Sequence, residues 1–163
     1  MKENQHVRDG SCLRQVKMLG KRWWPPILPR VISSTTNIRV RYAETDKMGI
    51  VYHTNYFVWF ELCRVEMLDN IGLSYRELES RGYLLPVLDI SASYKKPAFF
   101  DDKVQVVCFI DEPPTLRINI SYEVRRGEEL LVTGTSRHAF MSPEGRPVKP
   151  PKDVVAHFDQ YFP

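Results

Sequence analysis

Residues 55–70 have the pattern of a helix that is apolar on almost every side. Large apolar residues recur at spacings of three and four, which is the period of one helix face. Further apolar side chains fill the positions between them. The apolar positions are Tyr56, Phe57, Val58, Trp59, Phe60, Leu62, Cys63, Val65, Met67 and Leu68. A helix of this composition is expected to lie buried, so the rest of the chain must supply a layer that covers it.

The segments around this helix have the pattern of β-strands. Residues 37–43 alternate with period two, which places Ile38, Val40 and Tyr42 on one face. A second, short helix is predicted for residues 74–81. Four more extended segments follow, at about 84–94, 104–110, 116–124 and 130–141. The elements predict an α+β protein in which a curved antiparallel sheet of about five strands wraps around one long buried helix. Such a sheet has open edges, so we also expect a homodimer with a continued sheet.

The beginning of the chain differs from the rest. Residues 1–30 contain seven Lys or Arg and only two Asp or Glu, and they include the run Trp23-Trp24-Pro25-Pro26. The prolines argue against a helix or a central strand. We interpret residues 1–35 as a basic, flexible extension that contains Trp and Pro, and residues 36–163 as a single domain. A transit peptide and an arm docked through its tryptophans are the alternatives.

Composition excludes several classes of function. Residues 31–163 contain 16 basic and 18 acidic residues, so the folded part gives no support to nucleic-acid binding. No apolar run is long enough to span a membrane. Three widely spaced cysteines, without a CxxC pair, fit a reducing compartment, and we predict a cytoplasmic protein. Four histidines without ligand spacing predict no metal site.

The candidate catalytic residues lie in the segment just before the long helix and at its start. An acidic turn with Asp46 and Gly49 leads into the helix, and His53 and Asn55 lie at its start. The first turn of a helix has free N–H groups and a partial positive charge, which stabilise negative charge developing on oxygen. A carboxylate facing such a helix end can attack a carbonyl or activate a water. The pattern therefore favours a hydrolase.

The same segment, Arg41 to Tyr56, reads RYAETDKMGIVYHTNY. It resembles the signature of the hotdog-fold 4-hydroxybenzoyl-CoA thioesterase family, and within it the bacterial acyl-CoA thioesterase branch associated with the Tol–Pal system. Further matches follow in family order. They are Gly72-Leu73-Ser74-Tyr75, Leu85-Pro86-Val87, residues 94–102 (YKKPAFFDD) and Gly145-Arg146-Pro147. The resemblance covers about residues 37–155.

This resemblance implies a hotdog fold, a dimer or tetramer, and hydrolysis of an acyl-CoA thioester. It implies no metal and no cofactor, because coenzyme A (CoA) is part of the substrate. The family's catalytic aspartate corresponds to Asp46 and its helix-mouth histidine to His53. Gly49 corresponds to the glycine that lets the turn pass close to substrate. The family often has a small residue where this chain has Lys47.

The remaining substrate-binding candidates surround these residues or could reach the CoA phosphates. They are Tyr52, Thr54, Asn55, Lys95 and Arg137. Arg and Lys suit phosphate oxygens, although solvated strand ends would have the same composition. Whether Asp46 is the nucleophile or a general base stays open. Two other functions also stay open: a hotdog hydratase or dehydratase acting on acyl thioesters, and a non-catalytic acyl-CoA-binding or scaffold protein. The basic extension could contact a partner or an anionic membrane surface.

Overall fold

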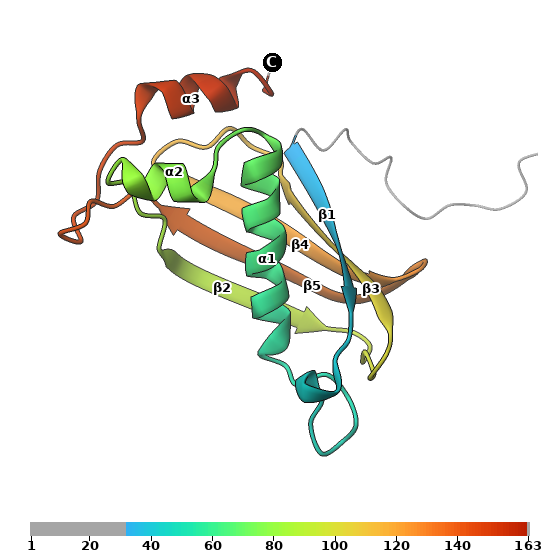
Figure 1. The fold of residues 1–163 in the computed structure, drawn as a ribbon. Coiled ribbons are helices and arrows are strands. Elements are labelled where there is room, and N and C mark those ends of the chain that lie inside the picture. The colour runs from blue at the N-terminus through green and yellow to red at the C-terminus, as the bar shows by residue number, and fades with distance from the viewer. Residues whose placement is uncertain (1–31, 163) are drawn as a thin grey trace, which may run out of the picture.

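The computed structural model describes residues 32–162, which form one antiparallel sheet and three helices (Figure 1). The predicted extension lies outside the described residues, except for its last four. The helices and strands in chain order are β1 Ile32–Arg39, the 3-10 turn η1 Tyr42–Glu44, α1 Asn55–Asn70, α2 Tyr75–Ser80, β2 Val87–Tyr94, β3 Lys103–Ile110, β4 Arg117–Arg126, β5 Glu129–Ala139 and α3 Lys152–Asp159.

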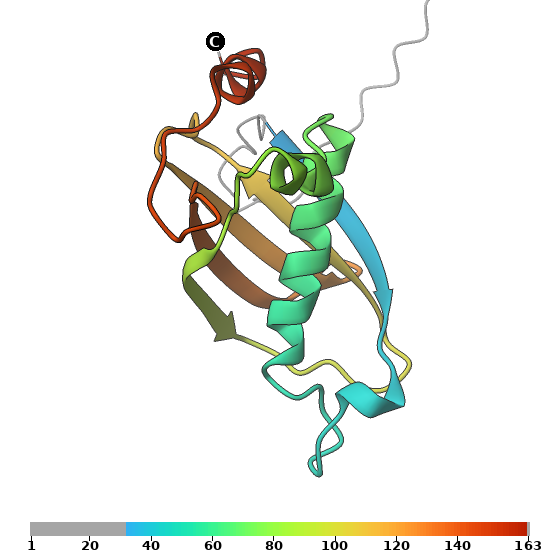
Figure 2. The same cartoon turned by 60° about the vertical axis from the view of Figure 1, so that its left-hand side comes forward.

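The five strands pair in the order β1-β3-β4-β5-β2, and every pair is antiparallel. The sheet curves around α1, which lies across its concave face (Figures 1 and 2). Apolar side chains alternate along the central strands because successive residues point to opposite faces of a sheet. The buried apolar positions of β3 and β4 are Val104, Val106, Cys108, Ile110, Ile118, Ile120, Tyr122 and Val124. The predicted α+β architecture, a curved sheet around one long helix, is confirmed.

Close contact between α1 and the sheet depends on a glycine in β5. A Cβ atom at Gly134 would lie 2.4 Å from Cε2 of Phe60, a separation that real Cβ atoms do not adopt. Phe60 is fully buried and its ring stacks on that of Tyr122 at 4.3 Å between centroids. Because glycine has no side chain, position 134 leaves room for the Phe60 ring, which packs the helix against the sheet.

The prediction that α1 is buried on most sides was wrong for the single chain. Its sheet-facing residues, among them Trp59 and Met67, are buried. On the other side, Val58 is 58% exposed and Leu62 is 43% exposed. One sheet covers only one side of a helix, so the apolar residues of the opposite side stay in contact with solvent.

Strand β1 begins earlier than the alternation indicated. It runs from Ile32 to Arg39, so Tyr42 lies beyond its end and is 78% exposed. The inward positions of this strand include Ser34 and Thr36, which are polar and gave no apolar pattern. They bond the polar end of α1 instead: Asn70 donates to Ser34 Oγ at 3.1 Å, and Thr36 donates to Glu66.

The structure also answers two smaller questions from the sequence. No helix of the described residues is long and apolar enough to cross a membrane. Cys63 and Cys108 are buried free thiols in the core between α1 and the sheet.

Candidate functional site

The turn that carries Asp46 is closed by its own backbone. The amide of Asp46 donates to the Ile50 carbonyl and the amide of Gly49 donates to the Asp46 carbonyl, both at 2.9 Å. Gly49 has a φ of 75°, a conformation that glycine adopts without steric cost. Oδ1 of Asp46 accepts from the Met48 amide at 2.8 Å. This Asx turn fixes the side chain at the turn, as is common for Asp, and the carboxylate is part-buried and faces a pocket.

A buried acid, Glu44, connects this turn to α1. Glu44 is 5% exposed, and its carboxylate accepts from the Arg41 amide at 2.7 Å, the Arg41 guanidinium at 3.0 Å and the Trp59 indole at 3.1 Å. Burial alone would raise the pKa of Glu44, but these hydrogen bonds outweigh burial and hold the pKa below its ordinary value. Its backbone carbonyl accepts from the Tyr52 amide at 2.8 Å and from the Asn55 side chain at 2.7 Å. Glu44 therefore joins the turn and the helix mouth in one network.

The mouth of α1 presents unused backbone donors. No hydrogen bond within residues 32–162 satisfies the N–H groups of His53 and Thr54, and the Thr54 side chain does not cap the helix. The hydroxyl of Tyr94 donates to the His53 carbonyl at 3.0 Å, which ties the helix mouth to the end of β2. The His53 ring lies between Tyr52, at 4.3 Å between ring centroids, and Tyr94, at 6.5 Å. The helix start is thus held in place with two N–H groups free.

The turn, the helix mouth and the end of β2 enclose a cavity of about 310 Å³. Its lining is mainly apolar and aromatic, with one carboxylate, one imidazole and two lysines. The lining residues are Asp46, Met48, Ile50, His53, Tyr56, Tyr94, Lys95, Lys96 and Pro97. A few polar groups in an apolar pocket are typical of a small-molecule site. The arrangement places a base, free amide donors and cationic groups around one space, which suits attack on a carbonyl.

The structure brings together three of the predicted site residues and places the others around them. Asp46, His53 and Lys95 line the same pocket. Those that support the pocket or its edge without lining it are Gly49, Tyr52, Thr54 and Asn55. Arg137 lies elsewhere, on β5, where its guanidinium is 3.6 Å from the Asp89 carboxylate of β2.

Sequence reasoning missed Glu44 and Tyr94 as parts of the site. Both act through contacts between distant segments: Glu44 bonds Trp59, fifteen positions later, and Tyr94 bonds His53, forty-one positions earlier. Tyr94 begins the matched stretch YKKPAFFDD, which was the available signal. No local pattern marks Glu44 as a buried acid.

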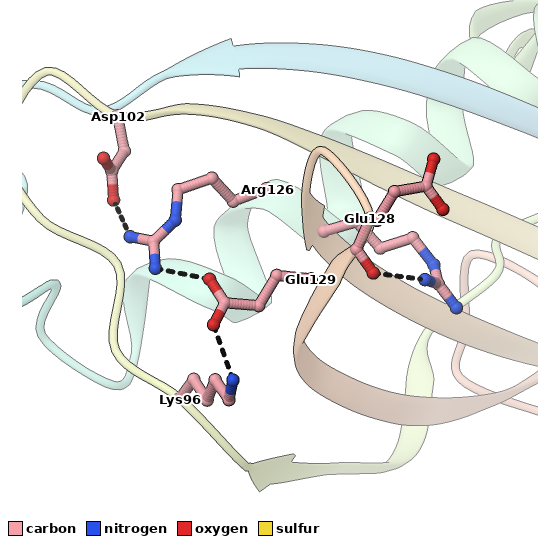
Figure 3. Close-up of polar contacts among 6 residues, drawn as sticks. Lys96, Asp102, Arg126, Glu128 and Glu129 are labelled. Carbon is pink, nitrogen blue, oxygen red and sulfur yellow. Dashed lines mark hydrogen bonds and ion pairs between the residues drawn. The ribbon is translucent and has the colours of Figure 1, made fainter.

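The segment after β2 is fixed to the Asp46 turn on one side and to the β4–β5 hairpin on the other. Val51 donates to the Ala98 carbonyl at 2.9 Å, and Ile50 and Phe99 form a β-bridge. Figure 3 shows the chain of ion pairs on the hairpin side. Its members, each pair at 2.6 Å, are Asp102 with Arg126, Arg126 with Glu129, and Glu129 with Lys96. The hairpin thus supports the segment that lines the pocket.

Within the described residues, no group of three or more His, Cys, Asp or Glu side chains could hold a metal ion. The prediction that catalysis needs neither a metal nor a separate cofactor stays a prediction.

Comparison with known proteins identifies the family. The sequence profile of the thioesterase-like superfamily matches residues 40–158, which include the turn, the long helix and the whole sheet after it. The chain belongs to this superfamily. Its fold is that of the hotdog thioesterases, as the resemblance implied.

Individual relatives agree with this assignment. The putative acyl-CoA thioesterase YneP of Bacillus subtilis is 39% identical over 112 residues, which cover 68% of this chain and 81% of that protein. The acyl-CoA thioester hydrolase YbgC of Escherichia coli is 27% identical over 126 residues, or 76% of this chain and 93% of that protein. The crystal structure of a DHNA-CoA thioesterase from Staphylococcus aureus superposes with a TM-score of 0.75 at 34% identity, covering 79% of this chain and 90% of that one.

Proposed function

We propose that the protein is an acyl-CoA thioesterase, which converts an acyl-CoA and water to a carboxylic acid and free CoA. The observation that carries the proposal is the pocket in which Asp46 lies beside a helix mouth with free N–H groups on His53 and Thr54. Membership of the thioesterase-like superfamily and the names of the relatives support it. The Tol–Pal branch and a 4-hydroxybenzoyl preference stay predictions from the resemblance.

The reaction needs little more than these groups, because a thioester carbonyl is poorly stabilised by resonance and a thiolate leaves readily. The free amides hold the oxygen of the thioester carbonyl as it gains negative charge. Asp46 accepts a proton from water while the water oxygen bonds the carbonyl carbon, or it bonds that carbon itself and water then cleaves the anhydride. The C–S bond breaks, and the CoA thiolate takes up a proton as it leaves. His53 lines the same pocket, where it can orient the water or the leaving sulfur.

Asp46→Ala tests this role directly. We expect turnover to fall by about 10³-fold, since the variant lacks the base or nucleophile, while thermal unfolding stays within a few degrees of wild type. The measurement is free-thiol release from a panel of acyl-CoAs. Asp69→Ala is the matched control, because Asp69 is an exposed acid at the end of α1 that is far from the Asp46 pocket. Near-wild-type hydrolysis by Asp46→Ala across the panel would show that the mechanism is wrong.

The same panel separates the rival enzyme class. A hydratase would add water to the double bond of an enoyl-CoA without releasing thiol. Double-bond hydration in the absence of thiol release would therefore replace the thioesterase proposal.

We also propose that the active form is a dimer in which two β2 strands pair. Strand β2 is an edge of the sheet, and its apolar residues Val87, Leu88 and Ile90 are 37–51% exposed. Nearby, the outer side of α1 exposes Val58 and Leu62. Unpaired edge strands and exposed apolar surface both favour association.

Antiparallel pairing of β2 about its centre gives the dimer a functional consequence. It sets Tyr94, at the Asp46 pocket, opposite the partner's Val87, so each site would be completed by residues of the other subunit. Ala92→Pro removes a donor from the free edge of the strand, because the Lys95 amide, three positions later, bonds β5 and successive amides of a strand point to opposite sides. This variant should give monomers with little activity in sedimentation and thiol-release measurements. A wild-type monomer with full activity would contradict the proposal.

A further inference from the structure

A second cavity lies between α1 and β2, farther along the helix than the Asp46 pocket, and shares no residue with it. Its volume is about 320 Å³. Phe57, Val58 and Ile90 form part of its apolar wall, and the charged residues of its lining are Glu61 and Arg64. A cavity of this size suits a short chain or a single ring. In the proposed dimer it opens next to the partner's Asp46 pocket, because it adjoins the Val87 end of β2.

Arg64 is the unusual residue of this cavity. The residue is only 7% exposed, its guanidinium lies over the Tyr75 ring at 5.1 Å, and Nη1 is buried without a hydrogen-bond partner. Within residues 32–162 no carboxylate forms an ion pair with it, and Glu61, one turn earlier on α1, is exposed to solvent. An arginine stays charged and can only donate. A buried cation without an anion is strongly destabilising, so an acceptor is missing from the single chain.

The polar side chains of β4 and β5 that line the cavity do not supply that acceptor, because none lies within hydrogen-bond distance of Nη1 and none carries a negative charge. The Tyr122 hydroxyl and Ser136 Oγ are 2.8 Å apart, Ser136 Oγ and His138 Nε2 are 2.8 Å apart, and His138 Nδ1 is 3.4 Å from the Leu85 carbonyl. Burial, followed by the charge of Arg64, lowers the pKa of His138 to about 4, so the ring is neutral at pH 7. With Nδ1–H donating to Leu85, the ring accepts from Ser136, which in turn accepts from Tyr122. These three side chains bond one another, and Arg64, which lines the same cavity, keeps a donor without a partner.

We propose that this cavity binds the far end of the acyl group, and that Arg64 selects acyl groups that end in a carboxylate. The apolar wall contacts the methylenes, and the terminal carboxylate supplies the acceptor and the negative charge that Arg64 lacks. Arginine geometry matches both carboxylate oxygens. The inference rests on the proposed thioesterase function and names its substrate class: CoA esters of dicarboxylic acids.

The test compares two esters with the same number of carbons, adipoyl-CoA and hexanoyl-CoA, which differ by the terminal carboxylate. We expect wild-type kcat/KM to be higher for adipoyl-CoA. Arg64→Met keeps the apolar stem and removes the charge; it should lower kcat/KM for adipoyl-CoA by about 10- to 100-fold and change that for hexanoyl-CoA little, as the loss of a charge-assisted bond predicts. Arg64→Lys should keep part of the preference. Arg76→Met, an exposed arginine on α2, is the charge-matched control and should leave the ratio unchanged.

Four outcomes are distinguishable. A wild-type enzyme that hydrolyses hexanoyl-CoA at least as well as adipoyl-CoA overturns the inference, whatever the variants do. An Arg64→Met variant that loses both activities equally also overturns it. Conversion of that variant to a monomer with an unchanged substrate ratio would mean that the missing anion comes from a second copy of the chain. If wild type hydrolyses no acyl-CoA at all, the proposed function itself fails.

Discussion

The buried carboxylate of Glu44 is the contact on which the geometry of the site depends most, and its replacement by Gln gives a measurable prediction. Oε1 accepts from the Arg41 guanidinium and the Trp59 indole, and Oε2 accepts from the Arg41 amide. Gln has the same shape but only one acceptor oxygen. In the better of its two orientations the amide NH₂ replaces Oε2 and faces the Arg41 N–H, so one part-buried donor loses its acceptor. An unsatisfied donor of this kind costs about 1–3 kcal/mol.

We therefore expect Glu44→Gln to lower the free energy of unfolding by about 2 kcal/mol at pH 7, measured by urea unfolding. Glu79→Gln, an exposed acid on α2, is the control and should be nearly neutral. Because the folded pKa of Glu44 lies below its ordinary value of 4.5, its ionised contacts stabilise the protein above that pH. The difference between wild type and variant should shrink as the pH falls from about 4.5 through the folded pKa.

A double-mutant cycle with Trp59→Phe isolates the indole contact. Trp59→Phe removes the indole donor, whereas Glu44→Gln keeps an oxygen at the Oε1 position but removes its charge and so weakens the bond to Trp59. The two single effects should therefore add to more than the double variant loses, by about 0.5–1.5 kcal/mol. Equal stability of Glu44→Gln and wild type at pH 7, or strict additivity in the cycle, would refute the role assigned to this carboxylate.

Two further substitutions examine the packing and the helix mouth. Gly134→Ala places a methyl group against the Phe60 ring and should destabilise the fold by about 1–3 kcal/mol, read as a lower midpoint in urea; a more stable variant would show that the ring can move away. Tyr94→Phe removes the hydroxyl that bonds the His53 carbonyl and should lower kcat by about tenfold, with an unfolding midpoint within about 1 kcal/mol of wild type. A wild-type kcat in that variant would mean that the helix mouth needs no such support.

The sequence predicted those elements whose apolar pattern reflects their environment in the folded chain. Strands β3 and β4 are covered on one face by α1, so their alternation survives in the sequence and their positions were found. Strand β1 was misplaced because its inward residues include Ser34 and Thr36, whose partners come from α1. The α1 pattern correctly predicted a helix, but it predicted too much burial, because nothing in one chain covers Val58 and Leu62. Their apolar character becomes intelligible only if another surface covers them.

In the site, too, the sequence predicted what depends on neighbouring residues and missed what depends on distant ones. Asp46, Gly49 and His53 lie within one short segment, so local spacing was enough to place them together. The cationic candidates were harder to assess from the sequence. A lysine beside a pocket can bind substrate only if no acid has already paired with it, and that pairing depends on strands that are distant in the sequence. Lys96 donates to Glu129 at 2.6 Å, and Arg137 lies against Asp89.

Lys95 differs from these two cations. It lines the Asp46 pocket, is exposed, and forms no ion pair with any of residues 32–162. Its backbone is nevertheless fixed, since its amide donates to the Leu131 carbonyl at 2.8 Å and the next residue is held by the hairpin network of Figure 3. A free ammonium group on a fixed backbone is what binding of a phosphate requires, because the charge is not already neutralised and the position is set beforehand. The pattern of ion pairs therefore favours Lys95 over Lys96 and Arg137 as the contact to the CoA phosphates.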